Sequence, residues 1–319
     1  MMIPYQALDQ FYFDEFVANL HPTLQTLAVD KHLLRHELDA EPLMTIKGLY
    51  QEQYLYMPYL LVDFFPINDT QLSIVGQAWI LRIIDFVMTD NIIDRQVPDN
   101  PLIVLFHQHL RTQSDQLFHQ VIGDNRAFWA HYYQVNHALN NANALEVYCV
   151  DQHRQPYTLD VMTEIYEARS ALLGIVIHVM ARLTDRLDEI EPFLQYYQKI
   201  ALADQLLDDA ADWRDDFRDG RYTLPIVKAL QAENIPFDKA HTLSEADYQI
   251  MITRHSILQL MNHLAIGQYE EVHHMLEQLN ALDSALAKFL QGRMDVAEHS
   301  MRRYNAIGLL QGFRNLLTE

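Results

Sequence analysis

Residues 204–225 read DQLLDDAADWRDDFRDGRYTLP and form the most informative stretch of the chain. Asp208, Asp212 and Asp216 are spaced four residues apart, so on a helix their side chains share one face. Carboxylates at this spacing repel one another and destabilise a helix. A divalent cation would offset that repulsion, and Mg²⁺ prefers carboxylate oxygens and often shares them with the phosphates of a substrate. The segment therefore predicts an acidic helix that binds Mg²⁺.

A second acidic pair stands far upstream, in residues 89–94, which read TDNIID. Asp90 and Asp94 are again four residues apart, at the end of a segment rich in apolar residues. Such a segment is expected to form a largely buried helix. Two acidic helices could clamp a magnesium–diphosphate cluster, so we expect both sets of carboxylates to point into one cavity. The sequence leaves open whether Asp209 or Asp215 replaces one of the expected ligands.

The composition favours an all-helical protein. Half of the 319 residues are hydrophobic, and only 9 glycines and 11 prolines occur. These are smaller shares than the roughly 7% and 5% that are usual. The formal net charge of −20 argues against binding to nucleic acid, because phosphate backbones are held by lysine and arginine. We expect one helical bundle.

Helix boundaries follow from apolar periodicity and from turn residues. Residues 5–60 are expected to form short helices, and Gly220 is expected to end the acidic helix as its C′ residue, with a short helix after Pro225. The longer helices are expected near residues 71–93, 101–121, 125–149, 159–183, 192–219, 244–265, 268–290 and 293–316.

The compartment is expected to be the cytoplasm. Cys149 is the only cysteine, which excludes an intramolecular disulfide and a cysteine zinc cluster. The N-terminus lacks the basic and apolar regions of a signal peptide. The apolar stretches at residues 59–67 and 171–180 are shorter than the ~20 residues that span a bilayer, so no transmembrane segment is expected.

The two acidic motifs, which stand about 120 positions apart in this sequence, resemble those of the class I isoprenoid synthases. Residues 89–94 resemble the first motif of squalene and phytoene synthases. Asp212-Trp-Arg-Asp-Asp216, followed by Gly220-Arg221 and Leu224-Pro225, resembles their second motif. The series Asp208, Asp212 and Asp216 is also similar to the metal-binding triad of class I terpene cyclases. Asn91 departs from the pattern, because polyprenyl synthases carry a second Asp there.

The resemblance implies a fold and a domain organisation. It implies an all-α, single-domain, isoprenoid-synthase-like helical bundle with a central active-site cavity. The domain would cover residues 1–319, with residues 1–60 as an N-terminal helical extension packed on it.

The resemblance also implies roles for individual residues. Mg²⁺, bound by Asp90, Asp94 and the acids of the second motif, would neutralise a substrate diphosphate and make it a leaving group. Arg303-Tyr304 is similar to the Arg-Tyr pair with which bacterial terpene cyclases grip the diphosphate. Arg169 and Arg221 are further candidates for binding it, since the fork of an arginine suits phosphate oxygens. Phe86, one turn before Asp90, would stabilise the allylic carbocation through its ring face.

The expected activity is therefore that of a class I terpene synthase. It would ionise a prenyl or bicyclic diterpenyl diphosphate, of twenty carbons, and release a terpene or a terpene alcohol. Further expectations are a homodimer and an upstream class II cyclase that supplies the substrate. Two alternatives stay open: a squalene- or phytoene-synthase-like enzyme that joins two prenyl diphosphates head to head, and a non-catalytic helical protein that retains the fold.

Overall fold

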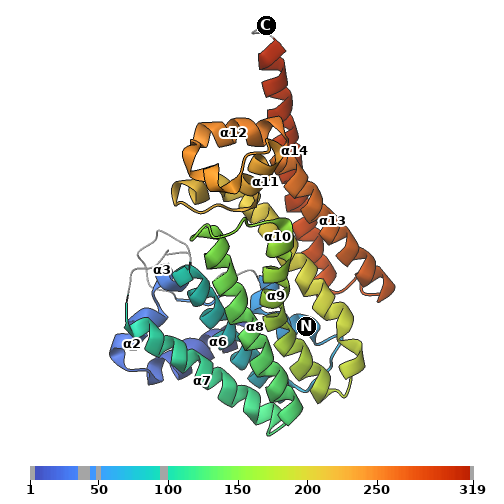
Figure 1. The fold of residues 1–319 in the computed structure, drawn as a ribbon. Coiled ribbons are helices and arrows are strands. Elements are labelled where there is room, and N and C mark those ends of the chain that lie inside the picture. Colours follow the sequence, from blue (N-terminus) through green and yellow to red (C-terminus); the bar gives the residue numbers. More distant parts are fainter. Residues whose placement is uncertain (1–3, 35–43, 48–51, 94–99, 317–319) are drawn as a thin grey trace. The chain divides into compact units, whose positions relative to one another are not determined.

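A computed structural model describes residues 4–34, 44–47, 52–93 and 100–316 (Figure 1). The structure is 81% helical, and no strand occurs in these ranges, so the expected all-α fold class is confirmed. The short N-terminal elements are α1 (Tyr5–Gln10), η1 (Phe11–Phe16), η2 (Val17–Asn19), α2 (Pro22–Ala28), α3 (Lys31–Leu34), α4 (Glu52–Leu55) and α5 (Met57–Leu61).

Longer helices make up most of the remaining chain. They are α6 (Asp69–Ile93), α7 (Leu102–Ile122), α8 (Arg126–Val150), α9 (Leu159–Leu183), α10 (Glu191–Arg218), α13 (Ile257–Gln278) and α14 (Ala285–Leu316). Shorter elements between them are η3 (Leu187–Glu189), α11 (Leu224–Ala232), η4 (Phe237–Thr242) and α12 (Glu245–Arg254). The predicted boundaries of α6 through α10 are confirmed to within about two residues, which is the usual uncertainty of a helix end.

The chain divides into two compact units. The first unit comprises residues 1–133 and 173–190, and the second comprises residues 134–172 and 191–319. Each unit is described by itself below. The expectation of one domain with an N-terminal extension stays a prediction.

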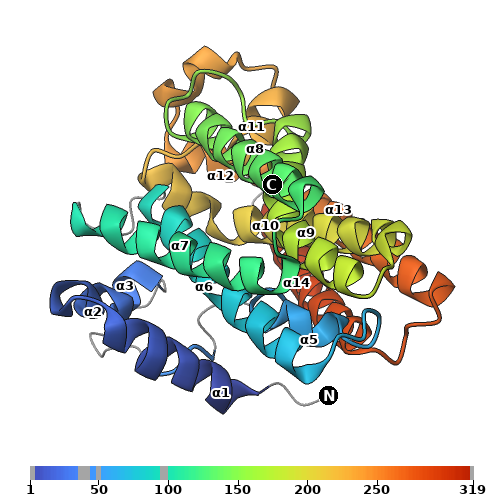
Figure 2. The same ribbon diagram turned by 90° about the horizontal axis from the view of Figure 1, so that it is seen from below.

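The first unit is built around α6, which packs along α7 (Figures 1 and 2). Elements α1, α3 and α5 also contact α6, and α2 contacts α7. The indole N–H of Trp79 donates to the carbonyl of Tyr54 at 2.7 Å, which satisfies the polar atom of a fully buried ring. Gly76 permits the close approach of Tyr59, whose hydroxyl would lie 2.1 Å from a β-carbon at that position. A side chain at Gly76 would therefore displace the N-terminal elements from α6.

Helix α6 is the one described helix that is long and apolar enough to cross a membrane. Its most apolar window is 72% buried inside the structure, as is usual for the core helix of a packed protein. Length and composition alone do not distinguish these two situations, so the expected absence of a transmembrane segment stays a prediction.

A histidine pair in the first unit predicts a loss of stability in acid. The rings of His131 and His178 lie 4.0 Å apart between centroids. Burial, His131 and Arg182 together lower the pKa of His178 from 6.5 to about 4. The unfolded chain therefore binds more protons than the folded chain between these two values, and stability is lost as the pH falls through that range. After allowance for partial exposure, we expect a loss on the order of 1–2 kcal/mol.

This loss can be measured as the free energy of unfolding in urea at about pH 7 and about pH 5. His178→Gln should be less sensitive to acid than the wild-type protein over this range. The matched control is His137→Gln, which removes an exposed histidine and should keep the wild-type pH dependence. Parallel pH profiles for the wild type and His178→Gln would contradict the prediction.

The second unit is centred on α10, α13 and α14, with α13 in contact with both of the others (Figures 1 and 2). Two tyrosine hydroxyls form hydrogen bonds between these helices. The hydroxyl of Tyr196 donates to the carbonyl of Leu286 at 3.0 Å, and that of Tyr269 donates to the Asp204 carboxylate at 2.6 Å. Arg293 on α14 lies 3.5 Å from the same carboxylate. One acid of the segment 204–216 thus serves the packing of the three helices.

Gly220 ends α10 as predicted, and its φ of +77° is the left-handed conformation that favours glycine. The Arg221 N–H donates to the carbonyl of Asp216 at 2.8 Å, and the Gly220 N–H donates to that of Phe217 at 3.0 Å. These two bonds form a Schellman motif, which satisfies the last carbonyls of the helix.

The predicted C-terminal helix boundaries were wrong. Residues 244–265 do not form one helix, because Ser256 adopts a φ of +51° between α12 and α13. The expected break between residues 265 and 268 lies inside α13, where a β-carbon at Gly267 would meet no neighbouring group within 4 Å. The chain turns instead after α13, where Asn280 has a φ of +52°. Asparagine is one of the few residues that adopt this conformation readily.

Candidate functional site

The acids of α10 lie on two faces of the helix. Asp208 and Asp212 are exposed, as is Asp215, whereas Asp216 is half-buried and Asp209 is 2% exposed. Asp209 and Asp216 are seven residues apart, so they share the inward side of the helix. Asp208 and Asp212 lie on its exposed side. The acidic run therefore contains an exposed pair and a packed pair.

The packed pair lies at the N-terminus of α11. The N–H of Leu224, the first residue of α11, donates to Asp209 Oδ2 at 3.2 Å. The hydroxyl of Thr223, the N-cap residue, donates to Asp216 Oδ2 at 3.2 Å. Acids are stabilising at this end of a helix because the free N–H groups and the helix dipole attract negative charge. Part of the acidic run is thus explained by local structure.

The pKa of Asp216 is shifted by burial and by the charged groups around it. Burial raises the pKa of the Asp216 carboxyl to about 6, while Arg221 and Thr223 act to lower it and Asp212 acts to raise it. The Arg221 guanidinium lies 4.0 Å from Asp216 and 3.7 Å from Asp151, which follows α8. Arg221 therefore lies beside the acidic run, between two carboxylates.

Tyr304 of α14 reaches the same part of α10. Its hydroxyl donates to the carbonyl of Ala210 at 3.1 Å, between Asp208 and Asp212 in the sequence. The charge of Asp212 contributes to a raised pKa of this tyrosine, although burial is the larger cause. Arg303 is exposed and acts on the pKa of Tyr304 in the opposite direction. Tyr304 and the second acidic motif are thus neighbours within one unit.

Arg169 lies in a buried polar network and is only 7% exposed. Its Nε donates to Asn143 Oδ1 and its Nη1 to the Tyr166 hydroxyl, each at 3.0 Å. Its Nη2 forms an ion pair with Glu146, which is also buried. Buried charges are tolerated when they are paired and hydrogen-bonded in this way.

The network continues from Arg169 to the acidic helix. The Tyr166 hydroxyl donates to Gln205 Oε1, and Gln205 Nε2 donates to Asp209 Oδ1 at 2.6 Å. Burial raises the pKa of Asp209 well above its ordinary value, despite the hydrogen bonds from Gln205 and Leu224. This chain of contacts, which we call the Arg169–Asp209 network, joins α8, α9, α10 and α11. It fixes α10 from beneath its exposed acids.

The first acidic motif belongs to the first unit. Asp90 and Phe86 are half-buried on α6, and Asp94 lies outside the described residues. Asn91 is 8% exposed and donates from its amide to the carbonyl of Leu33 at 2.8 Å. An ionised aspartate cannot donate this bond, so an asparagine side chain is needed for this contact. The expected meeting of the two acidic sets in one cavity stays a prediction.

A buried ionic cluster on α6 was not predicted. Asp85 is 2% exposed and lies 3.0 Å from Nη1 of Arg82 and 3.0 Å from Nε of Arg111, and it also forms an ion pair with His107. Two signals in the sequence could have found it: Arg82 and Asp85 stand three residues apart in an apolar helix, and His107 and Arg111 stand four residues apart on the next one.

The donor set of α10 fits a hard divalent cation. Asp208 and Asp212 present carboxylate oxygens at the surface, and Asp216 has a raised pKa that a nearby cation would lower. Within the described ranges, no group of three or more His, Cys, Asp or Glu side chains is already arranged to hold a metal ion. The carboxylates would therefore have to gather around the ion on binding.

No known protein family model matches the sequence, and no curated protein matches it significantly.

Proposed function

We propose that this protein is a Mg²⁺-dependent class I isoprenoid synthase of the terpene synthase type. It would ionise a prenyl or bicyclic diterpenyl diphosphate, release diphosphate and form a terpene or a terpene alcohol. The carrying observation is that Tyr304, from the far end of the chain, donates to the backbone of α10 between Asp208 and Asp212. This bond supports the proposal, because the acids on either side of Ala210 in the sequence carry the carboxylate oxygens that Mg²⁺ prefers.

In this proposal the residues of the second unit bind and orient the diphosphate. Asp208, Asp212 and Asp216 would hold Mg²⁺, which supplies Lewis-acid stabilisation of the departing oxygens when it is bound. Arg221 and Arg303 would donate charge-assisted hydrogen bonds to those oxygens. The Arg169–Asp209 network would keep α10 in position, since a preorganised site needs no rearrangement during the reaction.

The residues of the first unit would have two roles. Phe86 would face an allylic cation with its ring, and Asp90 and Asp94 would bind Mg²⁺. These roles rest on the resemblance of the motif, together with the position of Phe86 one turn before Asp90 on the same helix.

A second candidate function is the head-to-head condensation of two prenyl diphosphates. It is favoured by the turn between α10 and α11, where Gly220 and Arg221 hold the positions of the Gly-Arg-x-x-Leu-Pro motif. The carbonyl of Gly220 lies 2.7 Å from His153 Nε2, and the ring of His153 stacks on that of Tyr222 at 4.0 Å. This ordered turn places Arg221 beside Asp216.

One experiment separates these functions. Purified protein is incubated with Mg²⁺ and a panel of prenyl diphosphates of increasing length, and the organic extract is analysed for products. A terpene or terpenol would support the proposed function, whereas a thirty- or forty-carbon product would support the condensing synthase. An extract without product, from folded protein with every substrate, would favour a non-catalytic protein that retains the fold.

Arg303→Ala is expected to reduce turnover about tenfold or more, because a charge-assisted hydrogen bond contributes roughly 1.5–3 kcal/mol. The matched control is Arg302→Ala. Arg302 points about 100° away on the helix and forms an exposed ion pair with Glu298 at 2.8 Å. Turnover should be nearly unchanged in that variant. Equal effects at the two positions would remove the main reason for preferring a cyclase to a condensing synthase.

A further inference from the structure

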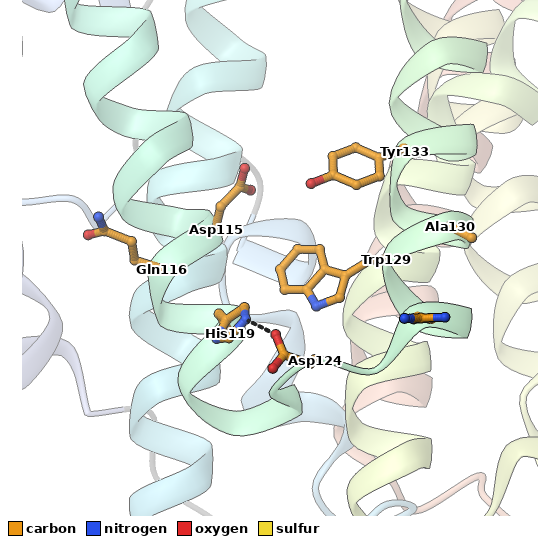
Figure 3. Close-up of a pocket in the computed structure, with 8 residues that line it drawn as sticks. Asp115, Gln116, His119, Asp124, Trp129, Ala130 and Tyr133 are labelled. Atoms are coloured by element: carbon orange, nitrogen blue, oxygen red, sulfur yellow. Dashed lines mark hydrogen bonds and ion pairs between the residues drawn. The ribbon is translucent and has the colours of Figure 1, made fainter.

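A pocket of about 810 Å³ lies in the first unit, where α7 and α8 meet at the turn around Gly123 (Figure 3). Asp115 and His119 come from α7, Trp129 and Tyr133 from α8, and Asp124 from the turn. Figure 3 shows Asp115, Trp129 and Tyr133 directed into the space between the two helices. None of these residues belongs to the motifs on which the proposed function rests.

Two aromatic rings form the α8 wall of the pocket. The rings of Trp129 and Tyr133 lie 6.3 Å apart between centroids and are tilted by 34°. The indole N–H of Trp129 donates to the Gly123 carbonyl at 2.8 Å, which fixes the ring. The ring of His119 stacks on the same indole, with 5.8 Å between the ring centroids. Tyr133 is 62% exposed, although large aromatic side chains are usually covered. The wall thus presents the ring of Tyr133 to solvent, with the half-buried ring of Trp129 beside it.

The α7 wall contributes one positioned carboxylate. Asp115 is half-buried, and the hydroxyl of Tyr132 donates to its Oδ1. Burial raises the pKa of Asp115, although Tyr132, Arg82 and Arg111 act to lower it, so a further cation would stabilise the ionised form of this carboxylate. The other acid of the pocket, Asp124, lies 3.0 Å from His119 Nε2.

We propose that this pocket binds a small alkylammonium ion, with the cationic head group between the Asp115 carboxylate and the ring faces of Trp129 and Tyr133. Aromatic faces carry a negative potential and attract such ions, quaternary ammonium groups above all. A net charge of −20 favours the approach of cations to this protein. Arg126, which also lines the pocket, is exposed and can turn its charge toward solvent.

The test uses choline as the probe and the fluorescence of the protein as the readout. Trp79 and Trp213 are 0% and 1% exposed, so a change in tryptophan emission on addition of choline reports mainly on Trp129. The titration is done with EDTA present, which removes divalent metal from the acidic helix α10. Saturable quenching by choline is expected, and 3,3-dimethyl-1-butanol, its neutral isostere, should produce none. Equal responses to the two compounds, or no response to choline, would overturn the proposal.

Variants locate the site. Tyr133→Ala should weaken choline binding about two- to fivefold, the effect of one cation–π contact at an exposed position. Tyr148→Ala is the matched control, because Tyr148 is another exposed tyrosine of α8, 45% accessible, outside the pocket. Asp115→Asn keeps an oxygen that can accept from Tyr132 and should weaken binding more strongly. Unchanged affinity in both Tyr133→Ala and Asp115→Asn would place choline elsewhere and refute the proposal.

Discussion

Replacing Arg169 by methionine is expected to lower the free energy of unfolding by about 3–5 kcal/mol, because it leaves the Glu146 carboxylate buried without its partner. Both side chains are less than a tenth exposed, at 7% and 5%. The substitution also removes the bonds to Asn143 and Tyr166, two further buried groups. Urea unfolding followed by circular dichroism measures the effect.

The double variant Arg169→Met/Glu146→Leu separates the loss of the ion pair from the loss of packing. A buried pair replaced by apolar residues of similar volume often leaves stability unchanged or improved, so the double variant should be clearly more stable than Arg169→Met alone. The surface control is Arg302→Met, whose partner Glu298 is exposed, and its effect should be less than about 1 kcal/mol. A loss in Arg169→Met no greater than in this control would contradict the buried-network interpretation.

The same double variant tests the catalytic role that the sequence motif suggests for Arg169. All three nitrogens of its guanidinium donate hydrogen bonds within the protein, to Asn143, Tyr166 and Glu146. If Arg169 binds diphosphate, a stable double variant should lose turnover, whereas a purely structural arginine leaves turnover close to that of the wild type. Stability and activity thus report separately on the two roles.

Helices α6 to α10 could be predicted from the sequence because their signals are local. Apolar periodicity, Pro98 and Pro101, and Gly220 mark their limits. The break after residue 254 carries no such signal, since Ser256 adopts left-handed backbone in a sequence that has no glycine or proline there, whereas Asn280 after α13 is a residue type that adopts this conformation readily. Gly267 stands within α13 and weakens the helical pattern there without ending it.

Which acids are exposed and which are packed could not be predicted, because it depends on partners distant in the chain. Asp209 and Leu224 are 15 residues apart, and Glu146 and Arg169 are 23 residues apart. Spacing on a helix shows which acids share a face, but it does not show which face packs. The candidate ligands Asp208 and Asp212 do lie on the exposed face, while Asp209 does not.

Asp212→Ala is expected to reduce turnover at least a hundredfold, because stabilisation of a leaving diphosphate by metal contributes several kcal/mol. Asp90→Ala should have a comparable effect. The fold should survive in both variants: removal of one of several repelling acids leaves the stability of the metal-free protein unchanged or raises it. Turnover is measured as diphosphate release at varied Mg²⁺ concentration, and helicity by circular dichroism.

Asp215→Ala is the matched control for Asp212→Ala, since both acids are exposed on the same helix within one turn. Asp215 already has a cationic partner, Arg218, 2.8 Å away at the surface, so its loss should change turnover little. Asp212→Asn replaces a metal-binding carboxylate by a weaker ligand. This variant should therefore need a higher Mg²⁺ concentration for half-maximal activity. Loss of helicity in Asp212→Ala, with turnover per folded molecule unchanged, would instead assign the acid to the structure of α10.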